Sequence, residues 1–344
     1  MATSRPPGDP KPGHLLTTVS NVTGAEAAHD EHVPVDVSQQ VRALVSAPLP
    51  LPGGGQTVTR WDALAAAARQ DVVVGRLLEA HADADAILAE VAGRRVSPRQ
   101  WWGVWAAEPP APVVIAERGA HGWVLSGTKS WCSGAGLCTH ALVTVRVGQE
   151  RPLFAVDLSH PGVSVDLSGW QPAGMRRSAT GAVTFDGVPA DPVGSPADYL
   201  ERPGFWHGGA GVAACWLGGA ERVADTLRRA GARFDDHAAA HLGAVDAVLA
   251  AARWSLHAAA AEVDARPQDV HTATIRALRV RAVVEAAAAQ TLDRVGRALG
   301  ATPLATDAAH TTAVADLLVY LRQSHAERDL AALGRLVGDP TDRP

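Results

Sequence analysis

The chain has 344 residues, of which 47% are apolar and 19% are charged, and its formal net charge is −5 at pH 7. This balance supports a sizeable hydrophobic core and lacks the basic surface that nucleic-acid binding requires. The three cysteines, Cys132, Cys138 and Cys215, form no CxxC pair and are odd in number, which fits a reducing compartment. No apolar run approaches the ~20 residues of a membrane span. We therefore expect a cytoplasmic protein without membrane or nucleic-acid partners.

The predicted elements form four blocks along the chain. Residues 1–36 are rich in Pro, Gly, Thr and His, lack the apolar core of a signal peptide, and predict a disordered tail. Residues 37–98 carry apolar side chains three and four positions apart, which predicts a short N-terminal helical domain.

The third block, residues 99–202, alternates short runs rich in Val, Trp and Phe with Gly and Pro. About six such runs at roughly ten-residue spacing are typical of an antiparallel barrel or sandwich. The fourth block, residues 203–338, is rich in alanine and shows helical periodicity over several long segments, which predicts an up-and-down helix bundle. The predicted fold class is therefore α+β, with a β domain between two helical regions.

The β block carries the most specific motif. Gly127, Lys129, Trp131 and Ser133 form a Gly-x-Lys-x-Trp-x-Ser pattern. Further motifs lie at Trp102 to Pro109, Pro161 to Val163, Gly174 to Arg176 and Gly181 to Pro189. In this order and at this spacing, the motifs resemble those of the acyl-CoA dehydrogenase superfamily of flavoproteins. The resemblance implies an FAD cofactor, a small-molecule substrate of the acyl-CoA type, and a homodimer or tetramer.

The resemblance also assigns a flavin site. Trp131 is expected to pack against the isoalloxazine ring, and Ser133 to donate a hydrogen bond to the ring nitrogen that accepts hydride. Ala106 and Ala107 occupy the family's flavin-bordering positions before Glu-Pro, where Ala107 replaces a threonine.

Two more family contacts are weakened towards the C-terminus. The Arg-x-x-Phe clamp for the FAD pyrophosphate keeps Phe234 but has glycine at the arginine position, and Arg233 is the nearby substitute. The motif near the adenine end appears here as Arg297 to Gly300.

The family's catalytic base is a glutamate late in the helix bundle, which removes the substrate α-proton while the flavin takes the β-hydride. The equivalent position falls at about Ser324, so no glutamate occupies it. His325 and Glu327 are the nearest substitutes and, with Ser324, are the candidate catalytic residues. A histidine here resembles the superfamily's flavin-dependent monooxygenases.

Three functions remain open. The leading hypothesis is FAD-dependent α,β-dehydrogenation of an acyl thioester. The second is a flavin-dependent monooxygenase that uses His325 as its base. The third is a non-catalytic or half-site subunit that forms a hetero-oligomer with a complete homologue; the altered base, the altered clamp and the short N-terminal domain favour it.

Two further patterns are interpreted as structural. The G-x-G-x-x-A match within residues 209–214 follows no strand, so we expect small residues for helix packing rather than a dinucleotide fingerprint. Asp83 and Asp85, beside His81, are expected to be helix-surface charges. No metal site is predicted.

Overall fold

The computed structural model describes residues 35–108, 111–231 and 235–338. The tail predicted for residues 1–36 lies outside the described residues, except for its last two positions. None of the described helices is both long enough and apolar enough to cross a bilayer.

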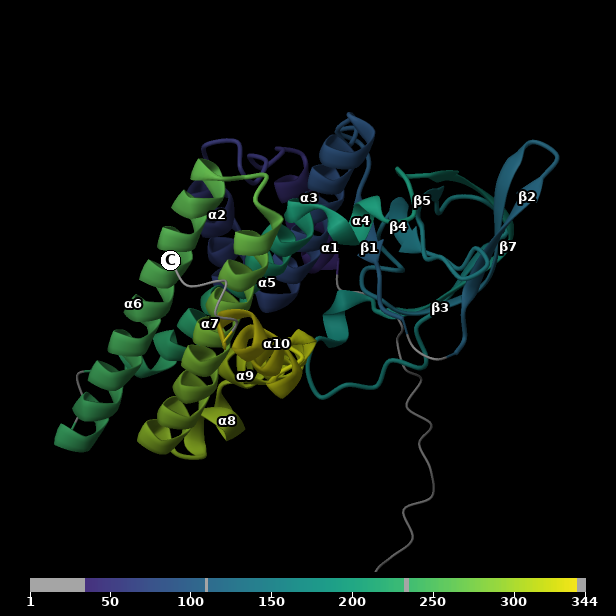
Figure 1. The fold of residues 1–344 in the computed structure, drawn as a ribbon. Helices are drawn as coiled ribbons and strands as arrows, with labels where there is room; N and C mark the ends of the chain where they lie inside the picture. Colours follow the sequence, from purple (N-terminus) through teal and green to yellow (C-terminus); the bar gives the residue numbers. More distant parts are fainter. Residues whose placement is uncertain (1–34, 109–110, 232–234, 339–344) are drawn as a thin grey trace, which may run out of the picture. The chain divides into compact units, whose positions relative to one another are not determined.

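Three helices open the described chain (Figure 1): α1 Val35–Val45, α2 Thr57–Gln70 and α3 Val72–Ala92. Asp71 alone separates α2 from α3, and its carboxylate accepts hydrogen bonds from the first free N–H groups of α3. Gly93 ends α3 in a left-handed conformation (φ 62°). Helix α3 contacts β1, α2 and α5, so it links the β domain to the helices that follow.

The β domain contains seven strands among the described residues, and they form one sheet in the order β1-β4-β5-β7-β3-β2, with β6 beside β7. Their bounds are β1 Trp102–Trp105, β2 Val114–Gly119, β3 Gly122–Cys132, β4 His140–Thr144, β5 Leu153–Asp157, β6 Val163–Asp166 and β7 Gly181–Pro192. A 3-10 turn, η1 Arg176–Ser178, precedes β7.

The sheet closes on itself. Arg146, just after β4, donates its N–H to Val114 O at 2.8 Å, and Ala116 N–H donates to Arg146 O at 3.1 Å. This bridge joins β2 back to the β4 segment, so five strands form a ring around an apolar core that includes Phe154 and Phe185. The predicted α+β fold with a β-barrel domain is confirmed. Two pairings differ from the antiparallel prediction, because β1 joins β4 in parallel and the closing bridge between Ile115 and Arg146 is also parallel.

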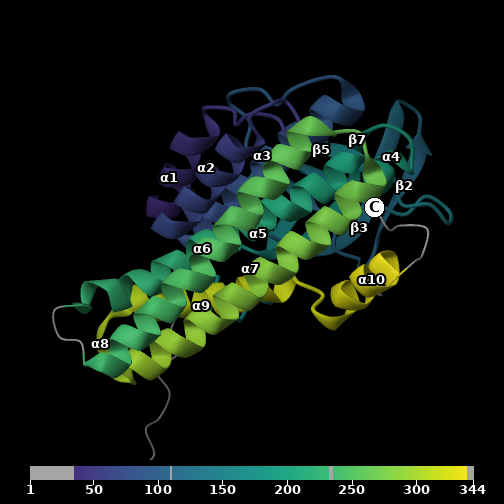
Figure 2. The ribbon, with the colours of Figure 1, turned by 60° about the vertical axis from the view of Figure 1, so that its left-hand side comes forward.

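The remaining helices form a bundle (Figure 2). Their bounds are α4 Asp198–Glu201, α5 Pro203–Arg229, α6 Asp236–Ala265, α7 Val270–Leu299, α8 Thr302–Thr306, α9 Ala308–Tyr320, the 3-10 turn η3 Leu321–Gln323 and α10 Glu327–Gly338. Helix α5 lies at the centre and packs against α2, α3, α6, α7 and α9.

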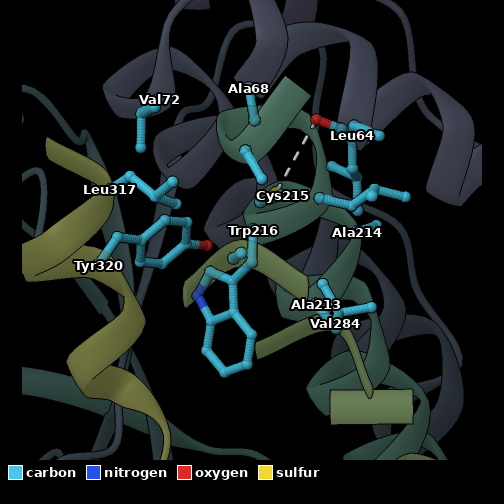
Figure 3. Packing of buried hydrophobic residues seen from close by; sticks show 14 of the residues in the cluster. Leu64, Ala68, Val72, Ala213, Ala214, Cys215, Trp216, Val284, Leu317 and Tyr320 are labelled. Atoms are coloured by element: carbon cyan, nitrogen blue, oxygen red, sulfur yellow. Dashed lines mark hydrogen bonds between the residues drawn. The ribbon is translucent and has the colours of Figure 1, made fainter. Parts of the chain in front are cut away.

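Small residues allow α5 to pack closely. A Cβ on Gly218 would lie 2.0 Å from Ala65 O of α2, so only glycine fits there. Residues 209–214 lie inside α5 with no preceding strand, and Gly211 packs against Leu64. The segment is thus part of a helix and does not form the loop of a dinucleotide fingerprint. Figure 3 shows the core around Trp216 and Tyr320.

Candidate functional site

Trp131 lies at the end of β3, where the pairing of β3 with β7 shifts register. The shift places Trp131 in the left-handed region (φ 59°), a conformation that is rare and costly for a bulky residue. Its side chain is 62% exposed, whereas its neighbour Cys132 is fully buried. An exposed tryptophan in a strained conformation is not stabilised by burial within the chain. Its ring is therefore placed to contact a bound partner.

Ser133 follows β3 directly and is held through its main chain. Its carbonyl accepts a hydrogen bond from Trp105 Nε1 at 3.0 Å, and the next residue, Gly134, donates its N–H to Ser178 O at 2.9 Å. The Ser133 hydroxyl makes no hydrogen bond with a described residue. It is therefore available to a ligand beside Trp131.

The stretch before Glu108 adjoins Ser133. Trp105 ends β1, is 2% exposed, and reaches Ser133 through the hydrogen bond given above. Ala106 is half-buried and Ala107 is exposed directly after it. The structure therefore brings the two predicted flavin-bordering stretches together through the hydrogen bond from Trp105 to Ser133 O.

The buried side chain of Lys129 connects β3 to Glu108 and to Thr144 of β4. Its side chain is 5% exposed, and its Nζ donates to Glu108 at 2.9 Å and to the carbonyl and hydroxyl oxygens of Thr144 at 2.8 Å each. Burial lowers the pKa of Lys129, and Glu108 partly offsets this effect. Burial alone would raise the pKa of Glu108, but hydrogen bonds from Thr144 and Lys129 and the nearby positive charges outweigh it and hold this pKa below its ordinary value. The lysine of the motif thus has a structural role.

The base position lies at the turn between η3 and α10. Ser324 is half-buried there, and its hydroxyl donates to Glu285 Oε2 on α7 at 2.5 Å. Glu285 is 19% exposed and lies 3.7 Å from Arg322. A carboxylate therefore does reach this position, but from another helix. Sequence reasoning missed Glu285, and the only signal was one acidic residue in an apolar and alanine-rich part of α7.

His325 and Glu327 lie beside this turn. The His325 side chain is 57% exposed, and its Nδ1 is 3.1 Å from Asp329 Oδ1. A carboxylate at Nδ1 favours the tautomer that leaves Nε2 free to accept a proton. Glu327 is exposed and opens α10, where a negative charge suits the helix N-terminus. Of the two, His325 has the partner expected of an oriented base.

Arg281 of α7 forms a wall of the same region. It donates to Gly209 O at 2.9 Å and to Gln323 O at 3.3 Å. Its guanidinium carbon lies 4.7 Å from the centre of the Trp216 ring, and Tyr320 packs edge-on against that ring (Figure 3). The Trp216 indole nitrogen is buried without a hydrogen-bond partner among the described residues. Arg281 thus places a buried guanidinium between the apolar core and the segment that leads to Ser324.

One turn of α3 connects this region to the Trp131 stretch. Leu77 packs against Gly134, directly after Ser133. Its neighbour Arg76 lies near both Tyr320 and Cys138. The loop after β3 and the segment that leads to Ser324 therefore flank the same turn of α3.

The predicted contacts to the distal part of FAD are not brought to this region within one chain. Arg297 and Gly300 lie at the C-terminal end of α7, about four turns or 20 Å beyond Glu285. Arg297 is 64% exposed and lies 3.5 Å from Asp293. Arg233 and Phe234 lie outside the described residues.

The expectation that Asp83, Asp85 and His81 are helix-surface charges is wrong. His81 and Asp85 are 4% and 3% exposed. His81 Nδ1 accepts the Trp102 N–H at 3.2 Å, and Asp85 accepts from Arg95 Nε at 2.9 Å. Burial raises the pKa of Asp83. The physical reason is that α3 is covered by β1 on one side and by α5 on another.

Known proteins give this geometry a context. Residues 108–188 match the family model of the acyl-CoA dehydrogenase middle domain. An L-evernosamine nitrososynthase of a Micromonospora species is 40% identical over 106 residues, covering 26% of this chain and 25% of the relative. The match thus spans about a quarter of that relative's length.

Two solved structures share the fold over most of the chain. A complex of KijD3 with FMN and dTDP-3-amino-2,3,6-trideoxy-4-keto-3-methyl-D-glucose has a TM-score of 0.75 at 20% identity, covering 91% of this chain and 89% of that one. A dibenzothiophene monooxygenase of a Paenibacillus species has a TM-score of 0.72 at 18% identity, covering 90% and 96%. The acyl-CoA dehydrogenase-like fold expected from the motifs is confirmed. Of these proteins, one is named a nitrososynthase and one a monooxygenase.

Proposed function

We propose that this chain is a flavin-dependent monooxygenase that transfers one oxygen atom from O2 to a polar substrate, with an amino-sugar nitrogen as the leading acceptor. The observation that carries the proposal is the base position. The turn there carries Ser324 and His325 in place of a glutamate, and Asp329 orients His325. The Arg281 guanidinium reaches the end of η3 through Gln323 O. The named nitrososynthase relative supports an amine as acceptor.

The residues on the β side suit a flavin ring. The exposed Trp131 offers an aromatic face, and the Ser133 hydroxyl offers a free donor beside it. Bound in reduced form, the flavin supplies two electrons, so that one atom of O2 enters the substrate and the other leaves as water. We take the flavin to be FMN, which the KijD3 complex contains. The residues expected at an adenine end, Arg297 and Gly300, lie far along α7 from the base position.

In this proposal His325 moves the proton. Its Nε2 accepts a proton from the substrate amine, and Asp329 at Nδ1 stabilises the resulting imidazolium. Glu285 and Ser324 position the turn that carries His325, because their hydrogen bond ties that turn to α7.

The direct test supplies the purified protein with FMN, NADH, a separate flavin reductase and 18O2, and offers the dTDP-linked 3-amino sugar as substrate. We expect flavin uptake and one 18O atom in the first product. His325→Ala should slow product formation at least 100-fold. His121→Ala, an exposed histidine in the β2–β3 turn, serves as the matched control and should leave the rate unchanged.

Acyl thioester dehydrogenation remains the second candidate, because the Glu285 carboxylate reaches the base position. Anaerobic bleaching of bound flavin by an acyl-CoA, lost in Glu285→Gln but kept in His325→Ala, would establish it and overturn the monooxygenase. A chain that takes up neither FMN nor FAD by itself would overturn both and support the half-site subunit.

A further inference from the structure

Arg281 is a cation of the helix bundle that forms no ion pair with a described residue. It lies on α7, and burial lowers the pKa of its guanidinium. Charged side chains are rarely withdrawn from water unless an opposite charge pairs with them. The contacts that keep Arg281 in this position therefore come from neutral groups.

These neutral groups belong to two other elements. Nη1 donates to Gly209 O of α5 at 2.9 Å, and Nη2 donates to Gln323 O at the end of η3 at 3.3 Å. The guanidinium carbon lies 4.7 Å from the centre of the Trp216 ring, within the range of a cation–π contact. Arg281 thus joins α7 to α5 and to η3, and it fixes the main chain at Gln323.

A second residue of α7 acts on the next position of that segment. Glu285 lies one helical turn after Arg281, on the same side of the helix. Its carboxylate accepts a hydrogen bond from the Ser324 hydroxyl. Two α7 side chains of opposite charge therefore hold two consecutive residues, Gln323 and Ser324, directly before His325.

The turn of residues 324–326 has few other restraints. Its remaining hydrogen bonds are local, to residues within 321–330. Ala326 is in the left-handed region (φ 46°), a strained conformation that persists only where the surroundings hold it. Helix α10, which follows, has no buried residue. The two bonds from α7 therefore tie this turn to the bundle.

The charge of Arg281 also acts on the partner of His325. The Asp329 carboxylate lies 3.1 Å from His325 Nδ1. It is the first negative charge acting on the guanidinium, ahead of Glu285 and Glu79. A nearby positive charge stabilises an ionised carboxylate. Arg281 therefore favours the ionised Asp329 that accepts a hydrogen bond from the imidazole.

We propose that Arg281 is a positioning residue for His325. Its bond to Gln323 O fixes the turn, and its charge favours the ionised Asp329. The imidazole then keeps Nδ1–H towards that carboxylate and leaves Nε2 free to accept a proton. The catalytic consequence rests on the proposed function, in which His325 is the base, whereas the geometry of the turn does not.

The test compares Arg281→Met, which removes the donors and the charge, with Arg281→Lys, which keeps the charge without the planar guanidinium. Arg279→Met, at an exposed arginine of the same helix, is the matched control. NMR of the full chain with nitrogen-labelled histidine reports the tautomer of His325, and His325→Ala assigns its signal.

We expect the Nδ1–H tautomer of His325 to predominate in the unaltered chain and in Arg279→Met, and to become a mixture in Arg281→Met. Amide hydrogen exchange at His325 and Ala326 should be about tenfold faster in Arg281→Met, because the turn opens locally. Arg281→Lys should lie between the two. In the oxygen-transfer assay, Arg281→Met should lower kcat about tenfold and leave KM within about twofold.

An unchanged tautomer and unchanged exchange in Arg281→Met would overturn the positioning role. If circular dichroism shows that Arg281→Met does not fold, Arg281→Lys decides, and exchange at His325 equal to that of the unaltered chain would overturn the role. An unaltered chain that transfers no oxygen would overturn the proposed function alone, because the tautomer and the exchange rates do not depend on turnover.

Discussion

The buried Lys129 of the motif from Gly127 to Ser133 gives the sharpest prediction about stability. Lys129→Met keeps the length of the side chain but removes three hydrogen bonds of 2.8–2.9 Å, one to Glu108 and two to Thr144. Hydrogen bonds to a charged group contribute about 1.5–3 kcal/mol each when both partners are buried. Glu108 is 32% exposed, so solvent screening reduces the contribution of its hydrogen bond with Lys129 to about 1 kcal/mol. Methionine also relieves the desolvation of the ammonium group. The expected net loss is about 2 kcal/mol.

Urea unfolding followed by tryptophan fluorescence measures this loss, and a double-mutant cycle with Glu108→Gln isolates the pair. We expect a coupling free energy of about 1 kcal/mol. The matched control is Arg297 with Asp293, an exposed pair at 3.5 Å. That pair should couple by no more than about 0.5 kcal/mol. A Lys129–Glu108 coupling no larger than the control value would refute the view that this pair holds the stretch together.

Three further predictions concern Gly127, Trp131 and Glu108. Gly127→Ala should destabilise the fold by about 3 kcal/mol or more, because φ is +114° and the added Cβ would lie 2.2 Å from Val113 O; unchanged urea unfolding would contradict this. Trp131→Ala should leave the free energy of unfolding within about 0.5 kcal/mol, since the side chain is exposed, yet raise the flavin Kd about tenfold in fluorescence titration. Because the pKa of Glu108 is lowered in the fold, its stabilisation is present above the ordinary value of 4.5 and is lost as pH falls through the lowered pKa. Unfolding curves of Glu108→Gln should lack this acid-dependent loss, and identical pH profiles for the two proteins would contradict it.

The β domain could be predicted from the sequence because its determinants are local. Gly127 marks a backbone position that no other residue fills. Trp131, on the same strand, and Ser133, directly after that strand, follow it at fixed spacing. Turn residues and alternating apolar runs report such a strand directly. The closure of the barrel between β2 and Arg146 could not be predicted from the sequence, because a single bridge outside the strands forms it.

The helical part was less predictable at the level of side chains. Asp85 lies on a helix whose sequence periodicity does not show which elements pack against this residue. Its partner Arg95 lies beyond the end of that helix. Asp83 faces Gly208, which is 125 positions away in the chain. Periodicity identifies a helix but not the elements that cover each of its faces, so the buried charges of α3 were mistaken for surface charges.

Glu285 was missed for a related reason. Its hydrogen bond to Ser324 joins α7 to a turn 39 positions later, and the path between them includes two helices and η3. Counting along a motif located the turn but could not identify the helix that lies against it. His325 was found because it is adjacent to the counted position, and its partner Asp329 lies one helical turn further along the chain.

The two sides of the candidate site therefore differ in how much change they tolerate. On the β side, Gly127 and Lys129 fix the barrel itself, so a change there costs stability whether or not a flavin is bound. On the helical side, Ser324 and His325 lie in a half-exposed turn held by a few local hydrogen bonds and one to α7, where a substitution costs little. Under the proposed function, a chain of this kind keeps a flavin-type barrel while its base changes from a carboxylate to a histidine. In that proposal the barrel carries the resemblance in fold, and the turn between η3 and α10 carries the residues that set the reaction.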